Sequence, residues 1–312
     1  MARFKSILIF TIVIVVFDRT IGGAFKRLYF KTQSGEGGGL INYALTKNPD
    51  ILVLGSSRAK HHVDSAILSK EFSATVYNAG INGQDFLYAA MLLDVRRLSN
   101  TPPKIILLHV DRESLSSDDA DQNVKVFSYY LDKSELVKKI LSRRSLVDRI
   151  KYLSMAYRAN GKVLPILKNL GHKEFGDRDG FVPLNGVMKF PVADLKPNTP
   201  LLPWKVEILK KIVEECDSRG TKLCLFTSPR FVCDSKQYVD YQEWRTQMLK
   251  LLISFPSVRF IEIDTFTNPV FLQGRLYKDS SHLNGEGAET FSLLLARKLK
   301  AAIAEGQDTR KQ

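Results

Sequence analysis

The sequence contains few cysteines and few tryptophans. Its 312 residues include three cysteines and two tryptophans, and no internal repeat or low-complexity tract is visible. The cysteines, Cys216, Cys224 and Cys233, form no Cys-x-x-Cys motif and have no histidine at metal-ligand spacing. This pattern argues against a metal site and against a disulfide-stabilised scaffold. It allows one disulfide bond without selecting the pair, although the apolar run around Cys224 is typical of a buried thiol.

Acidic residues are outnumbered by basic ones. The chain has 46 Lys and Arg against 33 Asp and Glu, which gives a formal net charge of +13. The basic residues are spread over predicted helices, as in Lys138-Lys139 and Lys210-Lys211, and no nucleic-acid-binding motif accompanies them. We therefore expect solvated basic helix faces and no nucleic-acid partner.

One segment near the N-terminus lacks charge altogether. Residues 6–17 are uncharged and mostly apolar, with basic residues before them and Asp18 and Arg19 after them. The run is shorter than the roughly 20 residues that span a bilayer, and no clear signal-peptidase site follows it. We expect residues 1–31 to form an uncleaved signal anchor, a single transmembrane helix, with the remaining chain outside the cytoplasm. A cleaved signal sequence and a buried helix are the alternatives, and the basic residues do not decide the orientation.

After this segment, short apolar runs alternate with segments of helical periodicity. Strands are predicted at residues 51–55, 74–80, 104–110, 221–229 and 259–264. Continuous apolar strands separated by helices are typical of a parallel sheet that is covered on both faces. We therefore predict an α/β fold: an open, parallel five-stranded sheet with helices on both faces, a flavodoxin-like three-layer sandwich, preceded by the transmembrane helix.

Composition also predicts the domain organisation. Residues 32–47 are expected to be a glycine-rich linker, residues 48–305 the α/β domain, and residues 306–312 a polar tail. Residues 160–202 break the alternation and are too long for a plain connection, so we expect an insertion that covers the site as a lid. Three of its aromatic residues are candidate platforms for a sugar ring: Phe175, Phe181 and Phe190.

Polar residues follow the predicted strands, at the edge where ligands bind in sheets of this kind. Ser57 comes directly after the first strand, and a serine hydroxyl becomes a nucleophile only when an oriented base takes its proton. Asp279 and His282 lie three residues apart near the C-terminus, so a turn can place both on one side. The sequence thus offers the parts of a Ser-His-Asp triad. Taken alone, Ser57 could equally be the N-cap of the following helix.

Three blocks carry a family resemblance: Gly-Ser-Ser-Arg at 55–58, Asn-Ala-Gly-Ile-Asn-Gly-Gln-Asp at 78–85, and Asp-Ser-Ser-His-Leu-Asn-Gly-Glu-Gly at 279–287. In order and spacing, residues 48–305 resemble the SGNH/GDSL hydrolase family in a membrane-anchored bacterial form. The resemblance implies ester chemistry without a metal or cofactor.

The resemblance also assigns roles to individual residues. It makes Ser57 the nucleophile, His282 the base and Asp279 the residue that orients the base. The backbone N–H groups of Ser57 and Gly83 would bind the oxyanion, with Gly80 as the less favoured alternative to Gly83.

The sequence departs from the family pattern after the third strand. The family has an asparagine there whose side chain contributes to the oxyanion hole, whereas this chain has Asp111-Arg112. An ionised aspartate would repel an oxyanion, and the loss of one donor costs about 10²–10³ in rate. Either Arg58, Asn82 or Arg112 substitutes, or activity is weak or lost. The residues expected to line the site are therefore Ser56, Arg58, Asn82, Asp111 and Arg112.

By analogy with the family, the chain is expected to be a serine ester hydrolase or O-acetyltransferase that acts on O-acetyl groups of an exported polysaccharide. Two rivals remain open. One is a weakly active or inactive glycan-binding or assembly protein that keeps the fold, which the Asp111 departure favours. The other is an esterase for lipid acyl chains, which the anchor and the basic surface suggest.

Overall fold

A computed structural model describes residues 2–35, 38–97, 101–116, 125–172, 178–189, 200–231 and 235–308. The chain divides into two compact units, each continuous in space but not in sequence. The first unit, called the anchor unit after the role predicted for residues 1–31, comprises residues 1–46, 94–98 and 120–175, and the sheet unit comprises residues 47–93, 99–119 and 176–312. Residues 120–175 belong to the same unit as the N-terminal segment. The linker and insertion boundaries given above stay predictions.

The sheet unit is built on five parallel strands. They are β1 (Ile51–Leu54), β2 (Val76–Asn78), β3 (Ile105–His109), β4 (Lys222–Phe226) and β5 (Arg259–Ile261). Their order in the sheet is β2-β1-β3-β4-β5. Every neighbouring pair is parallel, and β1 pairs with both β2 and β3. The predicted α/β fold with an open, five-stranded parallel sheet is confirmed.

Both faces of the strands are apolar because helices cover both. Side chains alternate between the two faces along each strand. Val53, Leu107 and Phe226 belong to one core cluster together with Phe291 and Leu295 of the last helix. Leu52 and Leu108, which alternate with them, are fully buried on the opposite face.

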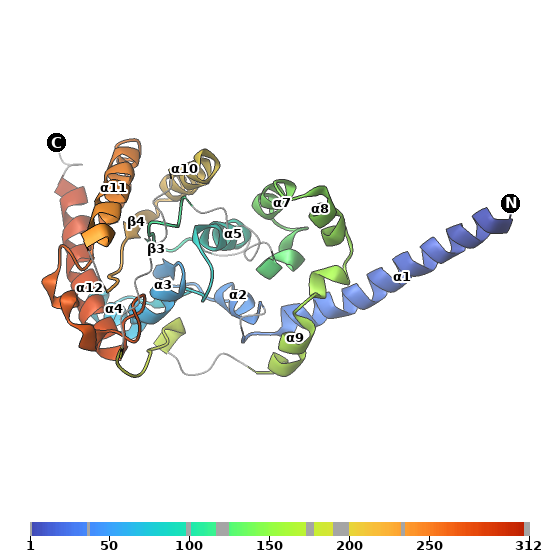
Figure 1. Ribbon diagram of the computed structural model, residues 1–312, viewed down its shortest axis with the longest axis horizontal. Helices are drawn as coiled ribbons and strands as arrows, with labels where there is room; N and C mark the ends of the chain where they lie inside the picture. Colours follow the sequence, from blue (N-terminus) through green and yellow to red (C-terminus); the bar gives the residue numbers. More distant parts are fainter. Residues whose placement is uncertain are drawn as a thin grey trace. The chain divides into compact units, whose positions relative to one another are not determined.

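The helices of the sheet unit follow the strands in the predicted alternation (Figure 1). They are α3 (Ser57–His62), α4 (Ser65–Phe72), α5 (Phe86–Arg96, whose last turn belongs to the anchor unit), α10 (Pro203–Ser218), α11 (Ser235–Leu252) and α12 (Gly285–Asp308). Helix α12 packs against α3, α4 and β5, and α10 packs against β4. Short 3-10 turns complete the unit at Arg178–Gly180, Pro269–Leu272 and Gly274–Leu276.

The anchor unit is helical. Its elements are α1 (Ala2–Lys31), α2 (Gly39–Ala44), α7 (Glu135–Ser142), α8 (Leu146–Leu153) and α9 (Val163–Asn169), with 3-10 turns at Ser128–Tyr130 and Tyr157–Ala159. Residues Arg3–Lys31 of α1 are long and apolar enough to cross a membrane, with a mean hydropathy of 2.0 over the best window. The predicted long apolar N-terminal helix is therefore present.

The second half of α1 packs within the anchor unit. Tyr29 is fully buried, and its backbone oxygen accepts a hydrogen bond of 2.6 Å from the side chain of Asn42 in α2. Asn42 in turn accepts a hydrogen bond of 2.6 Å from the hydroxyl of Tyr130. Part of the predicted linker is therefore a folded helix that holds the base of α1 in place.

The two cysteines within the described residues are free thiols. Cys216 on α10 and Cys224 on β4 are both buried, as the apolar run around Cys224 predicts. Cys233 lies outside the described residues. Burial raises the pKa of each of the two thiols to about 12, so both are protonated at neutral pH.

Candidate active site

The candidate site begins where β1 ends. Gly55 has a φ of 144°, and a Cβ there would lie 2.6 Å from Cβ of His109. Only glycine therefore lets the chain leave β1 this close to β3. Ser56 follows in an extended conformation and is the N-cap of α3, its hydroxyl accepting a hydrogen bond of 3.4 Å from the amide of Arg58. Ser56, and not Ser57, thus takes the capping role that the sequence left open.

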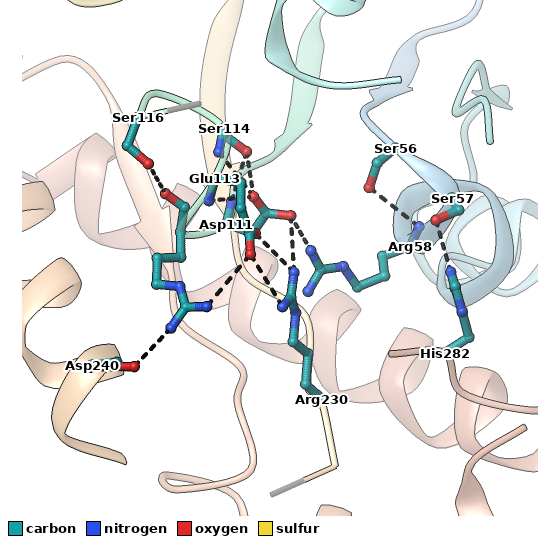
Figure 2. A network of polar contacts seen from close by, with 11 residues as sticks. Ser56, Ser57, Arg58, Asp111, Glu113, Ser114, Ser116, Arg230, Asp240 and His282 are labelled. Carbon is teal, nitrogen blue, oxygen red and sulfur yellow. Dashed lines mark hydrogen bonds and ion pairs between the residues drawn. The ribbon is translucent and has the colours of Figure 1, made fainter. Parts of the chain in front are cut away.

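Ser57 instead points its hydroxyl at a histidine. Its Oγ lies 2.8 Å from Nε2 of His282, a residue 225 positions away in the sequence. Both side chains are only partly buried, so a substrate can reach them. Figure 2 shows this pair at the start of α3.

A turn formed by Asp279 holds the histidine. The Asp279 carboxylate accepts hydrogen bonds from the amides of Ser281 and His282, at 2.8 and 2.9 Å. Its two oxygens also lie 3.0 and 3.1 Å from Nδ1 of the His282 ring. A carboxylate can only accept, so Nδ1 carries the hydrogen and Nε2 presents a lone pair to Ser57. The geometry is that of a serine nucleophile, a base and an orienting acid.

His62, which sequence reasoning did not assign a role, holds the same turn in place. Its ring is fully buried, and Nε2 accepts a hydrogen bond of 2.9 Å from the amide of Leu283, next to His282. Its Nδ1 is hydrogen-bonded to the hydroxyl of Ser228 at the end of β4. Burial, together with the charge of His282, lowers the pKa of His62 well below its usual range, so the ring stays neutral and can accept.

His61 connects the site to the loop after β2. Its ring lies 2.8 Å from Oδ1 of Asn82 and 6.0 Å, centroid to centroid, from the ring of His282. Gly83, which follows Asn82, is exposed and has a φ of 66°. A Cβ on Gly80 would lie 2.5 Å from the amide nitrogen of Lys60, so Gly80 is required for packing against α3. The oxyanion role of Gly83 stays a prediction.

Asp111 lies in a network of matched charges (Figure 2). Its Oδ2 is ion-paired with Arg58 and lies 3.8 Å from Nη2 of Arg230. Its Oδ1 accepts hydrogen bonds of 3.0 and 2.9 Å from the amide and hydroxyl of Ser114. Burial acts to raise the pKa of Asp111, but the charge of Arg58, together with smaller contributions from Arg230 and the hydrogen bond of Ser114, outweighs it and holds the pKa well below its usual range.

This network bears on the expected repulsion of an oxyanion. Figure 2 shows the Arg58 side chain extending from the Ser57 end of α3 toward Asp111. The aspartate charge is therefore compensated before it can act on a substrate at Ser57. Arg112 is similarly engaged, with Nη1 3.2 Å from the carboxylate of Asp240. The predicted site-lining residues Arg58, Asp111 and Arg112 are thus brought together, in a network that no sequence spacing indicates.

A cavity opens at the carboxyl ends of β3, β4 and β5. Aromatic and charged side chains line it together, among them Arg58, Asp111, Arg230, Phe231, Tyr241 and Phe266. Trp244 also borders it but is 2% exposed.

Part of the predicted insertion lies against the site. The amide of Val182 donates to the oxygen of Lys60 in α3 at 3.2 Å, and the amide of Met188 donates to the oxygen of Tyr277 at 2.7 Å. The amide of Gly285 donates to the oxygen of Leu184 at 2.9 Å. Of the candidate aromatic platforms, Phe181 is buried and is a packing residue, whereas Phe175 and Phe190 lie outside the described residues.

The pKa of His282 predicts how esterase activity depends on pH. Burial lowers the pKa of His282, and the charge and hydrogen bond of Asp279 act in the opposite direction. A base must be neutral, so activity is expected to be full at neutral pH and lost only as pH falls below about 6.5, the ordinary histidine value. Asp279→Asn removes a group that raises this pKa and should move the acid limb to still lower pH. The kcat/KM of p-nitrophenyl acetate hydrolysis, measured against pH for the parent chain and for Asp279→Asn, gives the two acid limbs. An acid limb of the parent chain at or above the ordinary histidine pKa contradicts the prediction.

Neither a scan against protein-family models nor a search of curated proteins finds a match for the chain. Among solved structures it is similar to a Streptococcus pneumonia protein provisionally named a platelet activating factor (14% identity, TM-score 0.41, covering 96% of this chain and 99% of that one). It is also similar to a GDSL-like lipase from Bacteroides thetaiotaomicron (11%, 0.37, 81% and 88%). A third similar structure is a family two carbohydrate esterase from Clostridium thermocellum in complex with cellohexaose (8%, 0.40, 83% and 66%). At these identities the likeness concerns the course of the backbone alone.

Proposed function

We propose that the chain is a membrane-anchored serine esterase or O-acetyltransferase of the SGNH type, acting on O-acetyl groups of an exported polysaccharide. One observation carries the proposal. The hydroxyl of Ser57, the ring of His282 and the carboxylate of Asp279 form a hydrogen-bonded chain at 2.8 and 3.0 Å. That chain lies at the carboxyl edge of a parallel sheet, where sheets of this kind place their ligands.

The reaction proceeds in two halves. Ser57 Oγ attacks the acyl carbonyl while His282 Nε2 takes the hydroxyl proton, and Asp279 stabilises the imidazolium that forms. The tetrahedral intermediate collapses as His282 returns the proton to the departing sugar oxygen, which leaves an acyl ester on Ser57. Water, or a second sugar hydroxyl in the transferase case, then gives its proton to His282 and attacks this ester. The acetyl group leaves as acetate or on the new hydroxyl, and Ser57 regains its proton.

The oxyanion is assigned to backbone donors. The N–H groups of Ser57 and Gly83 take this role, and Asp111 keeps the turn after β3 and the Arg58 side chain in place. With the Asp111 charge matched by Arg58 and Arg230, the argument for a catalytically silent glycan-binding protein loses its main support. The mixed aromatic and charged lining of the adjacent cavity suits a carbohydrate better than a long acyl chain.

The proposed location of the protein in the membrane rests on the packing of α1 in the anchor unit. We assign α1 as a retained membrane anchor with the sheet unit outside the cytoplasm. Support comes from its base: Tyr29 is fully buried and Asn42 is hydrogen-bonded to it, so removing α1 as a cleaved leader would dismantle this packing.

The test uses the full chain in phosphatidylcholine vesicles. We expect labelling by a fluorophosphonate, turnover of p-nitrophenyl acetate well above that of p-nitrophenyl palmitate, and release of acetate from an O-acetylated polysaccharide. Preference for palmitate would favour the lipid esterase instead. Folded protein that neither labels nor turns over any of the three substrates would overturn the proposal and restore the non-catalytic alternative.

A further inference from the structure

The surface of the anchor unit carries a second apolar feature besides α1. Helix α8 buries none of its residues. Its four large apolar side chains, Leu146, Val147, Ile150 and Leu153, are 56–65% exposed. Their spacing of one, four and seven positions places them on one face of the helix. Four adjoining exposed apolar side chains on one short helix are unusual for a surface that only water covers.

The surroundings of α8 are basic. Residues 133–151 contain seven Lys and Arg side chains and two acidic ones. Arg149 and Lys151 lie on α8 itself, and Arg143 and Arg144 immediately precede it. An apolar face combined with a basic polar face is the pattern of a helix that lies in the interface of an anionic membrane.

The end of α8 is fixed to α1 at one defined level. The carboxylate of Asp18 accepts hydrogen bonds of 3.0 Å from the amides of both Met155 and Ala156, and one from the hydroxyl of Ser154. A Cβ on Gly22 would lie 2.4 Å from the backbone of Met155, so the two segments are in direct contact. Residues 154–156, which directly follow α8, are thus attached to α1 where its exposed apolar run ends.

The length of that run sets the level of α8 relative to a bilayer. The exposed apolar side chains of α1 extend from Phe4 to Phe17. Fourteen helical residues at 1.5 Å each cover about 21 Å, against about 30 Å of hydrocarbon. A short span draws its flanking structure toward the membrane. Asp18 and the segment attached to it therefore lie in the interfacial layer, and α8 lies there with them.

We propose that α8 is a second membrane contact, lying in the interface of a bilayer that contains anionic phospholipid with Leu146, Val147, Ile150 and Leu153 toward the acyl chains. The proposal rests on the membrane anchoring proposed for α1 and is independent of the ester chemistry. It gives the anchor unit two attachments, a spanning helix and a surface helix, which together restrict its rotation about α1.

Tryptophan substitutions in the full chain test the proposal. Vesicle binding alone cannot test it, because α1 already holds the protein on vesicles whether or not α8 contacts the lipid. Ile150→Trp and Leu146→Trp probe the centre of the apolar face, Arg149→Trp is the matched comparison at its polar edge, and Val13→Trp reports the insertion of α1. The vesicles contain equal parts of phosphatidylcholine and phosphatidylglycerol, with or without bromine on the acyl chains. The fluorescence of the native Trp204 and Trp244 is measured in the parent chain and subtracted from that of each variant.

We expect brominated lipid to quench the added tryptophan in Ile150→Trp and Leu146→Trp at least about twofold more than in Arg149→Trp, with blue-shifted emission from both apolar-face variants. Water-like emission from these two variants, while the Val13→Trp variant is quenched, would overturn the proposal and leave the anchor intact. Blue-shifted emission that brominated lipid fails to quench would also overturn it, because a protein surface and not lipid would then cover α8.

Discussion

Replacing Ser57 by alanine is expected to abolish esterase activity and fluorophosphonate labelling together. The hydroxyl of Ser57 lies 2.8 Å from the base in His282, and the ester bond cannot form without it. Loss of a triad serine lowers kcat by about 10⁶ and leaves only the contribution of binding and the oxyanion hole. The measurement is p-nitrophenyl acetate turnover by the full chain, with labelling of the same sample by a fluorescent fluorophosphonate.

The neighbouring serine provides the matched control. Ser56→Ala removes the same atom one residue away, and Ser56 caps α3 through a single hydrogen bond of 3.4 Å to the amide of Arg58. Loss of a cap costs about 1 kcal/mol of stability, so this variant should melt slightly earlier and keep its labelling. If Ser57→Ala still turns over substrate and still labels, another nucleophile acts and the assignment of Ser57 fails. Loss of labelling in Ser56→Ala alone would point to Ser56 instead.

The sequence predicts the fold well because the signal is local. Each of the five apolar runs is a strand, and each observed strand lies within the predicted run, at most four residues shorter. The parallel order then brings Ser57 and the turn of Asp279 and His282 to one edge, although more than 220 residues separate them. The residue spacing within each block is enough to predict the triad, because the parallel sheet brings the distant blocks to the same edge.

Side chains that meet through tertiary packing could not be predicted in this way. His62 follows His61 in the sequence, and only the fold shows that its ring supports the amide of Leu283. The ion pair of Arg58 with Asp111 joins the ends of two adjacent parallel strands, and neither residue has a spacing that indicates the other. The anchor unit shows the same limit, since residues 120–175 join α1 through contacts that have no sequence motif.

The second large effect is expected at Asp111. Its side chain is 16% exposed and that of its ion-pair partner Arg58 is 7% exposed, so the two charges are largely removed from water. Breaking a buried pair by removing one member costs about 3–5 kcal/mol, because the remaining charge loses compensation that water cannot replace. Asp111→Ala should therefore lower the free energy of unfolding of the sheet unit by this amount. Asp111→Asn should cost less, since its side-chain oxygen can still accept from Ser114.

Urea unfolding followed by tryptophan fluorescence measures this loss, because Trp204 and Trp244 both belong to the sheet unit. Glu71→Gln is the control: it removes a carboxylate 2.7 Å from Lys300 in an exposed ion pair of the same unit. Exposed pairs contribute about 0–1 kcal/mol, so this variant should unfold almost as the parent chain does. Equal losses in Asp111→Ala and Glu71→Gln would show that the buried network does not stabilise the sheet unit.

The pH dependence of the free energy of unfolding is a second test of the network around Asp111. Against the opposing effect of burial, the charges around Asp111, of which Arg58 contributes most, hold its pKa well below its usual range. Above about pH 3.9, the value in an unfolded chain, the native carboxylate contributes its full stabilisation. As pH falls below that value the unfolded state takes up the proton first, so the parent chain loses stability. Asp111→Asn has no such proton to gain, and the stability difference between it and the parent should therefore narrow as the solution becomes more acidic. A difference that stays constant down to low pH would place the effect of Asp111 in its hydrogen bonds to Ser114 rather than in its charge.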